Sequence, residues 1–363
     1  MEPAQERKTE CAAGSSRPTY LINPLEDNRW EQFLQSHPQS SIFHTSAWLE
    51  ALRRTYGYRS WVITSNASTD PLTNAVVFCE VDSWLTGSRL VSLPFADHCQ
   101  PLVSSTVELS DLARSLSVRC QGSNRYIELR PLNFGATGIE SQTEFGRSAS
   151  YLLHTLDLRP SLETLFQGLH SSCIQRKISR AEREGLFYEA GNSDAAIERF
   201  YSLLTLTRQR HGLPPQPLAW FRNLRDCMGR DFTIHLASSQ GKPIAGILTL
   251  THKRTLVYKY GVSDARFHKL GAMPFLFWHV IQEGKKLSLV ELDLGRSDTD
   301  QQGLISFKNH LGATSSPLNY YRYPDQNIQR GAMRSSRFIS QLYSHLPRPL
   351  LRTAGRILYR HFG

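Results

Sequence analysis

Two tyrosines in the second half of the chain are candidates for chemistry. Tyr258 and Tyr260 flank Lys259 in a segment whose composition predicts a strand. Because side chains alternate between the two faces of a strand, both tyrosines are expected on one face. Their hydroxyls could line a substrate site there, donating hydrogen bonds or relaying a proton. Core packing with the hydroxyls at the rim explains the same spacing, and spacing alone favours this second interpretation.

A polar turn is expected where the next strand ends. Asp293 and Arg296 lie on either side of Gly295 in this segment. Ligands in open α/β sheets usually bind beyond the C-terminal ends of strands, so both are candidate substrate-binding residues. Asp293 could instead cap a helix or pair with Arg296. The following short helix carries Phe307 and Lys308, and a single lysine is more often a solvated surface residue than a catalytic one.

A basic cluster lies at the end of a long helix predicted over residues 161–184. The cluster contains four cations: Arg176, Lys177, Arg180 and Arg183. Cations near a helix C-terminus interact favourably with the helix macrodipole, so this cluster needs no ligand to explain it.

Several common enzyme signatures are absent from the sequence. The chain has no G-x-S-x-G, Walker A, H-E-x-x-H or G-x-G-x-x-G pattern, which argues against the usual hydrolase, NTPase, zincin and dinucleotide sites. Its 6 cysteines are scattered without a close pair. We therefore expect neither a disulfide framework nor a metal site. A protein without a disulfide framework is expected in a reducing compartment.

The positive charge is concentrated at the C-terminus. The chain has 363 residues and a net charge of +10, and residues 326–363 contain seven Arg but no Asp, Glu or Lys. The rest is close to neutral, which argues against an extended nucleic-acid groove. A helix is expected from about Pro349, with Arg on one arc and leucines opposite. It could lie on an anionic membrane or dock on the body of the protein with its Arg in water.

The order of the predicted elements indicates two α/β domains. We expect a disordered leader (1–17), a first domain (18–150), a second domain (151–325) and a basic amphipathic tail (326–363). The second domain alternates strands and helices in a pattern typical of a mixed sheet with helices on both faces. Its predicted strands are 153–158, 232–237, 244–250, 255–261, 290–294 and 318–323, and its predicted helices are 161–184, 194–209, 217–228, 274–286 and 303–311.

Six segments of the second domain together resemble the FemAB/FemX-like transferases, a family with two domains of the GNAT fold. These segments occur in the order and spacing of the family. They are Arg176–Leu186, Phe200-Tyr with Thr207–Gly212, Gly241–Gly246, Tyr258–Gly261, Leu292–Gly295, and Gly303 with Phe307-Lys308. The resemblance in the first domain is weaker and rests on Ser46–Leu52 and Tyr56–Tyr58.

The resemblance implies acyl or aminoacyl transfer to an amine of a cell-envelope, peptidoglycan or exopolysaccharide precursor. The implied donor is an acyl-CoA or an aminoacyl-tRNA, with no metal. Lys308 would stabilise the oxyanion at the reacting carbonyl, with Tyr260 as a second catalytic residue. Arg210 would bind an anionic part of the acceptor, and Tyr258 would line its channel. The other implied substrate-binding residues are Asp293, Arg296, Phe307, Arg176 and Lys177.

Two departures from the family pattern leave the acceptor and the donor open. Leu52 stands where the family has a substrate-binding lysine, and Arg266–Ala272 is spaced differently from the usual pyrophosphate-binding turn. A non-catalytic binding protein of an envelope assembly system is the alternative. The near-neutral body disfavours tRNA as a partner. We expect a cytoplasmic protein, with peripheral membrane contact through residues 347–362 as an open alternative.

Overall fold

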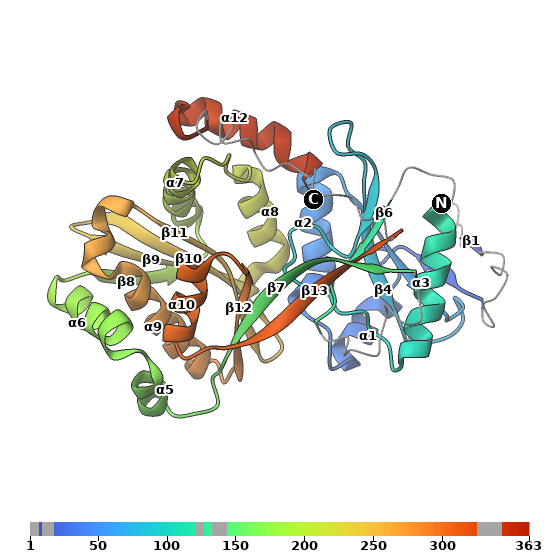
Figure 1. The fold of residues 1–363 in the computed structure, drawn as a ribbon, viewed down its shortest axis with the longest axis horizontal. Helices are drawn as coiled ribbons and strands as arrows, with labels where there is room; N and C mark the ends of the chain where they lie inside the picture. The colour runs from blue at the N-terminus through green and yellow to red at the C-terminus, as the bar shows by residue number, and fades with distance from the viewer. Residues whose placement is uncertain (1–6, 9–17, 121–125, 133–143, 325–342, 363) are drawn as a thin grey trace. The chain divides into compact units, whose positions relative to one another are not determined.

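The computed structural model describes residues 7–8, 18–120, 126–132, 144–324 and 343–362 (Figure 1). The chain divides into two compact units. Unit 1 comprises Met1–Ser150, Leu318–Gln329 and Tyr359–Gly363, and unit 2 comprises Tyr151–Pro317 and Arg330–Leu358. Most of the predicted leader lies outside the described residues, as does the first part of the predicted tail.

Unit 1 is a mixed sheet with helices. The strands of its sheet, in spatial order, are β1 (Arg7–Lys8), β2 (Tyr20–Ile22), β3 (Arg59–Thr64), β4 (Val76–Val81), β5 (Arg89–Val91), β6 (Tyr126–Leu129) and the last residues of β13 (Thr314–Tyr323). Its helices are α1 (Arg29–Ser36), η1 (Ile42–His44), α2 (Ser46–Tyr56), α3 (Thr106–Cys120) and η5 (Tyr359–His361). Residues 318–325 were expected in the second domain, whereas Tyr321 and Tyr323 pair with β6 inside unit 1.

The helix expected from Ser46 is confirmed as α2, and local chemistry sets both of its ends. The Thr45 hydroxyl accepts a hydrogen bond from the Trp48 amide at the N-terminus. Gly57 ends the helix with φ 74°, a left-handed conformation that glycine adopts without a Cβ penalty. Trp48 and Leu52 lie one turn apart and are both buried, so one face of α2 packs into the core of unit 1.

Unit 2 is also a mixed sheet, with helices on both faces (Figure 1). Its strands, in spatial order, are β7 (Gly146–Asp157), β12 (Glu291–Asp298), β11 (Thr255–Ser263), β10 (Lys242–His252), β9 (Phe232–Ser239) and β8 (Phe187–Gly191). β11 and β12 pair in parallel, whereas β7 with β12, β11 with β10, β10 with β9 and β9 with β8 pair antiparallel. The helices are α5 (Leu162–Gly168), η2 (Ser171–Gln175), α6 (Arg176–Arg183), α7 (Asp194–Arg210), α8 (Leu218–Met228), η3 (Gly229–Asp231), η4 (Ala265–Leu270), α9 (Ala272–Lys286), α10 (Gln302–His310) and α12 (Arg348–Leu358).

The prediction of one long helix over residues 161–184 is wrong. The chain forms α5, the π-helical turn η2 and then α6, because Leu169 and His170 have extended ψ angles of 138° and 123°. The His170 side chain caps the second segment by accepting a hydrogen bond from the Cys173 amide. The apolar positions keep their helical spacing across the break, so periodicity did not reveal it.

The prediction that Tyr258 and Tyr260 share one face is also wrong. A β-bulge at Lys259 places Tyr260 opposite Leu248 and Tyr258 opposite Thr249, so β11 contains one extra residue. Tyr260 packs against Phe221 of α8, and its hydroxyl accepts a hydrogen bond from the Trp220 indole at 3.0 Å. Tyr258 instead packs against Phe277 of α9, with ring centroids 5.0 Å apart.

A second bulge replaces the polar turn expected after Leu294. β12 continues to Asp298, and its register against β7 shifts by one residue between Asp293 and Arg296. Gly295 has φ 69°, which suits the left-handed residue of such a bulge. The buried Asp293 carboxylate accepts a hydrogen bond from the Gly295 amide at 2.7 Å. Asp293 therefore stabilises the bulge.

The amphipathic helix expected in the tail forms α12, but its apolar residues face two ways. Leu351 is fully buried, and a Cβ at Gly355 would collide with the Pro215 carbonyl, so α12 packs closely within unit 2. Leu350 and Ile357 point outward and are 57% and 53% exposed. No helix in the described parts of the chain is long and apolar enough to span a bilayer.

A buried histidine in unit 2 predicts acid sensitivity. Burial, followed by the charge of His279, lowers the pKa of His235 to about 3. At pH values between this pKa and the ordinary pKa of histidine, the His235 side chain binds a proton in the unfolded chain but not in the folded chain. Stability should therefore fall below about pH 6.5, by about 1.4 kcal/mol per pH unit from this group.

In His235→Gln, the free energy of unfolding should depend less steeply on pH between about pH 4 and 6.5, and the difference in slope should correspond to about one proton. Urea titration at several pH values measures this slope. Glutamine can still bond to Tyr188 and Thr249, the present partners of the ring. Replacing the exposed His345 is the control. An unchanged slope in His235→Gln would contradict the assignment.

Candidate functional site

A cavity of about 370 Å³ lies within unit 2, where β11 ends and α9 begins. Segments distant in sequence form its walls: α6, the end of α7, β11, the turn into α9, and α10. Its lining residues are Lys177, Thr207, Arg210, His211, Ile244, Tyr258, Gly261, Val262, Ser263, Asp264, Phe267, His268, Ala272, Met273, Pro274, Phe277, Leu304 and Phe307.

A hydrogen-bonded group of four residues forms the polar wall. The Thr207 hydroxyl donates to the Ser263 carbonyl at 3.1 Å and accepts from the Ser263 amide at 2.9 Å. The Arg210 guanidinium donates to the same carbonyl at 3.3 Å. The Ser263 hydroxyl lies 2.9 Å from His268 Nε2. The end of α7 is thereby tied to the end of β11, and Arg210 and His268 are held side by side.

The polar wall favours a neutral imidazole. Burial lowers the pKa of His268, and the charges of Arg210 and Lys177 lower it further. Arg210 Nη1 lies 3.4 Å from His268 Nε2. A guanidinium can only donate, so Nε2 is assigned as the acceptor and the proton is placed on Nδ1. The cavity therefore combines cations that can bind an anion with an imidazole that can accept a proton.

Aromatic residues form the apolar wall. The Phe307 ring lies 5.5 Å from Phe277, which also contacts Tyr258. Pro274 and Met273 of α9 complete this side. A pocket with one apolar wall and a few convergent polar groups is typical of small-molecule sites.

Four of the residues proposed from sequence line this cavity: Lys177, Arg210, Tyr258 and Phe307. The others lie elsewhere in unit 2. Arg176 is exposed on α6, and Tyr260 lies on the α8 side of the sheet. Asp293 is within the β12 bulge, and the Arg296 guanidinium stacks 4.2 Å from the Tyr151 ring centroid.

Lys308 is buried rather than solvated. It is 3% exposed, and its ammonium donates to the carbonyls of Gly295 and Arg296, both at 3.0 Å. The expectation that a lone lysine lies on the surface is therefore wrong here. Nearby His154 is fully buried, and burial followed by the charge of Lys308 lowers its pKa. Lys308 thus stabilises the bulged part of β12.

Sequence reasoning missed Ser263 and His268 as site residues. Ser263 is the last residue of β11, and His268 lies within η4. The Arg266–Ala272 segment compared with the pyrophosphate-binding turn includes His268, but His268 was given no role there. Thr207 was within a quoted segment but was given no role. The η4 turn itself was the one available signal, because a polar Ser-Asp-x-x-x-His sequence follows a strand and precedes a helix at the expected ligand-binding end.

The close approach of α6 to the start of α9 gives a prediction for the cavity wall. Gly271 has φ 79°, and a Cβ there would collide with the Lys177 backbone carbonyl. Gly271→Ala should lower the free energy of unfolding by about 1–3 kcal/mol and displace Lys177. Gly185→Ala is the matched control, because Gly185 has φ 66° with open space around its Cβ position. Equal thermal denaturation midpoints for both variants would show that the collision has no effect.

Comparisons with known proteins agree with this fold. A family model described as an acetyltransferase (GNAT) domain matches residues 170–308. A UDP-N-acetylmuramoylpentapeptide-lysine N(6)-alanyltransferase of Weissella viridescens is 28% identical over 96 residues, covering 26% of this chain and 29% of that protein. The chain therefore matches less than a third of the length of this curated relative.

Solved structures extend the likeness over most of the chain. FemX aligns with a TM-score of 0.66 at 13% identity, covering 84% of this chain and 96% of FemX. A tandem GNAT protein from the clavulanic acid biosynthesis pathway aligns with a TM-score of 0.52 at 12% identity, and the alignment covers 84% of this chain and 97% of that protein's chain. These likenesses confirm the expected tandem GNAT-like fold. Together with the matched GNAT domain and the alanyltransferase relative, they support the resemblance of this chain to the FemAB/FemX-like GNAT acyltransferases.

Proposed function

We propose that unit 2 transfers an acyl or aminoacyl group to an amine of a cell-envelope precursor. The observation that carries the proposal is the cavity in which His268, with a lowered pKa, lies beside Arg210 and Lys177. A nucleophilic amine must be neutral, and a neutral imidazole in the site can accept its proton. The two cations suit an acceptor that carries phosphate.

In the proposed reaction, Ser263 and His268 carry the proton of the amine to the leaving group. The amine nitrogen attacks the donor carbonyl, a C–N bond forms, and the ester or thioester bond breaks to release the alcohol or thiol. The proton lost by the amine passes to Ser263 Oγ, whose own proton moves to His268 Nε2, 2.9 Å away. His268 then returns a proton to the leaving group. Alignment of amine and carbonyl supplies much of the acceleration in such a mechanism.

The proposed acceptor is an amine linked to a diphosphate. The relative from Weissella viridescens is named for alanyl transfer to a lysine of a UDP-linked pentapeptide. Lys177 and Arg210 open onto the cavity from two different helices and could hold the two phosphates. A peptidoglycan precursor fits this chemistry, and an exopolysaccharide precursor bearing an amine and a diphosphate fits it equally.

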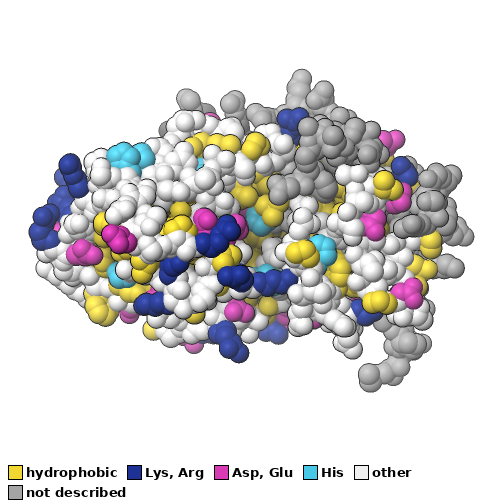
Figure 2. All heavy atoms as spheres, turned by 90° about the horizontal axis from the view of Figure 1, so that it is seen from below, with side chains coloured by type: hydrophobic (Ala, Val, Ile, Leu, Met, Phe, Trp, Pro, Cys, Tyr) yellow, Lys and Arg dark blue, Asp and Glu magenta, His cyan; other side chains and the backbone are white. Residues whose placement is uncertain are grey.

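The proposed donor is an acyl-CoA or an aminoacyl-tRNA. On the face of the molecule shown in Figure 2, Lys and Arg side chains lie interspersed with Asp and Glu. A tRNA-binding surface is expected to gather basic side chains, because phosphate contacts supply most of the affinity for nucleic acids. The chain outside the basic tail is close to neutral, which favours acyl-CoA as the first donor to test.

The test is a transfer assay with the purified full-length chain. UDP-N-acetylmuramoyl-pentapeptide would be incubated with labelled acetyl-CoA or alanyl-tRNA, and mass spectrometry would locate the added group. Transfer to an amine by the wild type, with loss in His268→Gln, is the expected result. Binding of the precursor without transfer from either donor would favour a non-catalytic binding protein.

We further propose that the protein acts in the cytoplasm and contacts the inner face of the membrane through α12. The outward Leu350 and Ile357 lie near the exposed Arg348 and Arg356 on the same helix. Exposed apolar residues beside arginines are typical of helices that bind anionic interfaces. Such contact would bring unit 2 close to lipid-linked precursors.

We expect the wild type to sediment with vesicles containing phosphatidylglycerol and to be released by salt. The double variant Leu350→Glu/Ile357→Glu should lose this binding, because each glutamate removes apolar contact and adds repulsion. Phe187→Glu is the control, since Phe187 is 63% exposed on β8 away from this helix. Equal sedimentation of the double variant and the wild type would exclude α12 as the contact.

A further inference from the structure

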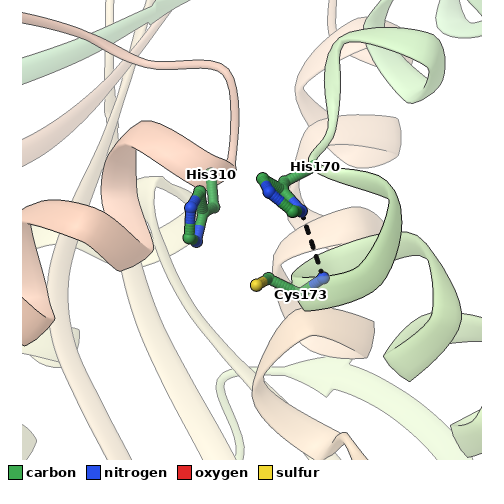
Figure 3. Close-up of side chains that lie close together, drawn as sticks. All are labelled: His170, Cys173 and His310. Carbon is green, nitrogen blue, oxygen red and sulfur yellow. Dashed lines mark hydrogen bonds between the residues drawn. The ribbon is translucent and has the colours of Figure 1, made fainter.

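Three side chains of metal-binding type converge in unit 2 outside the cavity. His170 precedes the π-helical turn η2, Cys173 lies within that turn, and His310 is the last residue of α10. Their ligand atoms all lie within 4.8 Å of one another. Figure 3 shows the two imidazole rings and the Cys173 sulfur gathered around a common space.

The backbone fixes this arrangement. The His170 amide donates to the His310 carbonyl at 2.9 Å, which holds together two residues that are distant in the sequence. Their ring centroids are consequently 4.2 Å apart. The tight turn then brings Cys173 back toward His170, whose Nδ1 accepts from the Cys173 amide at 3.3 Å, the dashed line in Figure 3. The backbone hydrogen bond between His170 and His310, together with the tight turn η2, thus sets the three positions.

The donor set suits zinc. One thiolate and two imidazoles are ligands that Zn²⁺ prefers, with bonds of about 2.3 Å to sulfur and about 2.0 Å to nitrogen. Tetrahedral bonds of these lengths place the ligand atoms about 3.3–3.6 Å apart. The observed limit of 4.8 Å exceeds this by little more than 1 Å, a gap that side-chain rotation can close. The fourth position would be open to water, because His170 is exposed.

We propose that His170, Cys173 and His310 bind one Zn²⁺ ion. Binding through His170 Nε2 would place the ring proton on Nδ1 and replace the long hydrogen bond to the Cys173 amide. The ion would join η2 to the end of α10, the helix that carries Leu304 and Phe307 into the cavity. It would therefore stabilise one cavity wall while taking no part in acyl transfer. The expectation of no metal site rested on the absence of a cysteine pair, and the two histidines replace that pair here.

The test begins with chelator-treated, full-length protein titrated with Co²⁺, which takes the place of zinc and is visible in absorption spectra. The wild type should bind one equivalent, with a near-ultraviolet thiolate-to-cobalt band and the visible bands of tetrahedral coordination. Zn²⁺ should displace the cobalt and raise the thermal denaturation midpoint. Failure to develop a thiolate band would overturn the proposal.

Variants assign the site to these residues. Cys173→Ser should abolish the thiolate band, and His310→Gln should weaken Co²⁺ binding by about 100-fold or more. Cys227→Ser is the matched control, because Cys227 is another half-buried cysteine, and this variant should leave Co²⁺ binding unchanged. Denaturation midpoints in chelator show that each variant folds. A thiolate band that survives in Cys173→Ser, or unaltered affinity in His310→Gln, would place the metal elsewhere and refute the site.

Discussion

Replacing Lys308 by methionine is expected to lower the stability of the protein. Methionine keeps most of the apolar part of the side chain but removes the ammonium, which leaves the carbonyls of Gly295 and Arg296 without this buried donor. Each buried carbonyl that loses its partner costs about 1–3 kcal/mol, so the free energy of unfolding should fall by about 3 kcal/mol. Urea titration measures this change.

The activity of Lys308→Met separates two roles for the lysine. If the Lys308 ammonium lies at the reacting carbonyl, its loss should make kcat about 100-fold lower in the variant. The rate is measured at a temperature where the variant remains folded. A purely structural lysine would leave kcat per folded molecule close to that of the wild type. Lys286→Met is the control, because Lys286 is an exposed lysine paired with Glu283. Wild-type stability in Lys308→Met would contradict its place in the β12 bulge.

Replacing Arg210 by glutamine should weaken acceptor binding and move the pH profile. Loss of a charged hydrogen bond to a phosphate costs about 1.5–3 kcal/mol, so kcat/KM should fall by about 10- to 100-fold. The positive charge of Arg210 also helps to lower the pKa of His268. Without this charge the pKa rises toward its ordinary value, and a smaller fraction of the imidazole is neutral at acid pH. The acidic limb of the rate profile should therefore shift to higher pH.

The matched control is Arg208→Gln, which removes a cation from the same turn of α7 but not from the cavity wall. It should change neither kcat/KM nor the pH profile by much. A fall in kcat/KM without a shift of the acidic limb would keep Arg210 as an anion-binding residue and remove His268 as the base. No change in either quantity would remove Arg210 from the site.

The sequence by itself determined which segments form helices and strands and how they follow one another. The apolar stripe of α2 and the position of its glycine cap suffice to place that helix, because capping and periodicity act over a few residues. The resemblance of the second domain likewise rests on short segments in a fixed order. Arg210, Tyr258 and Phe307 were found in this way, since each lies inside such a segment.

Only the tertiary structure decided which faces these segments present. A bulge inserts one residue and moves every later side chain to the other face, and no local pattern marked the bulges at Lys259 and Gly295. These bulges separated Tyr260 from Tyr258 and gave Lys308 its buried acceptors. His268 beside Arg210, and His310 beside His170, are pairs brought together by the folded chain. Their proximity depends on packing between distant segments, which local sequence does not encode.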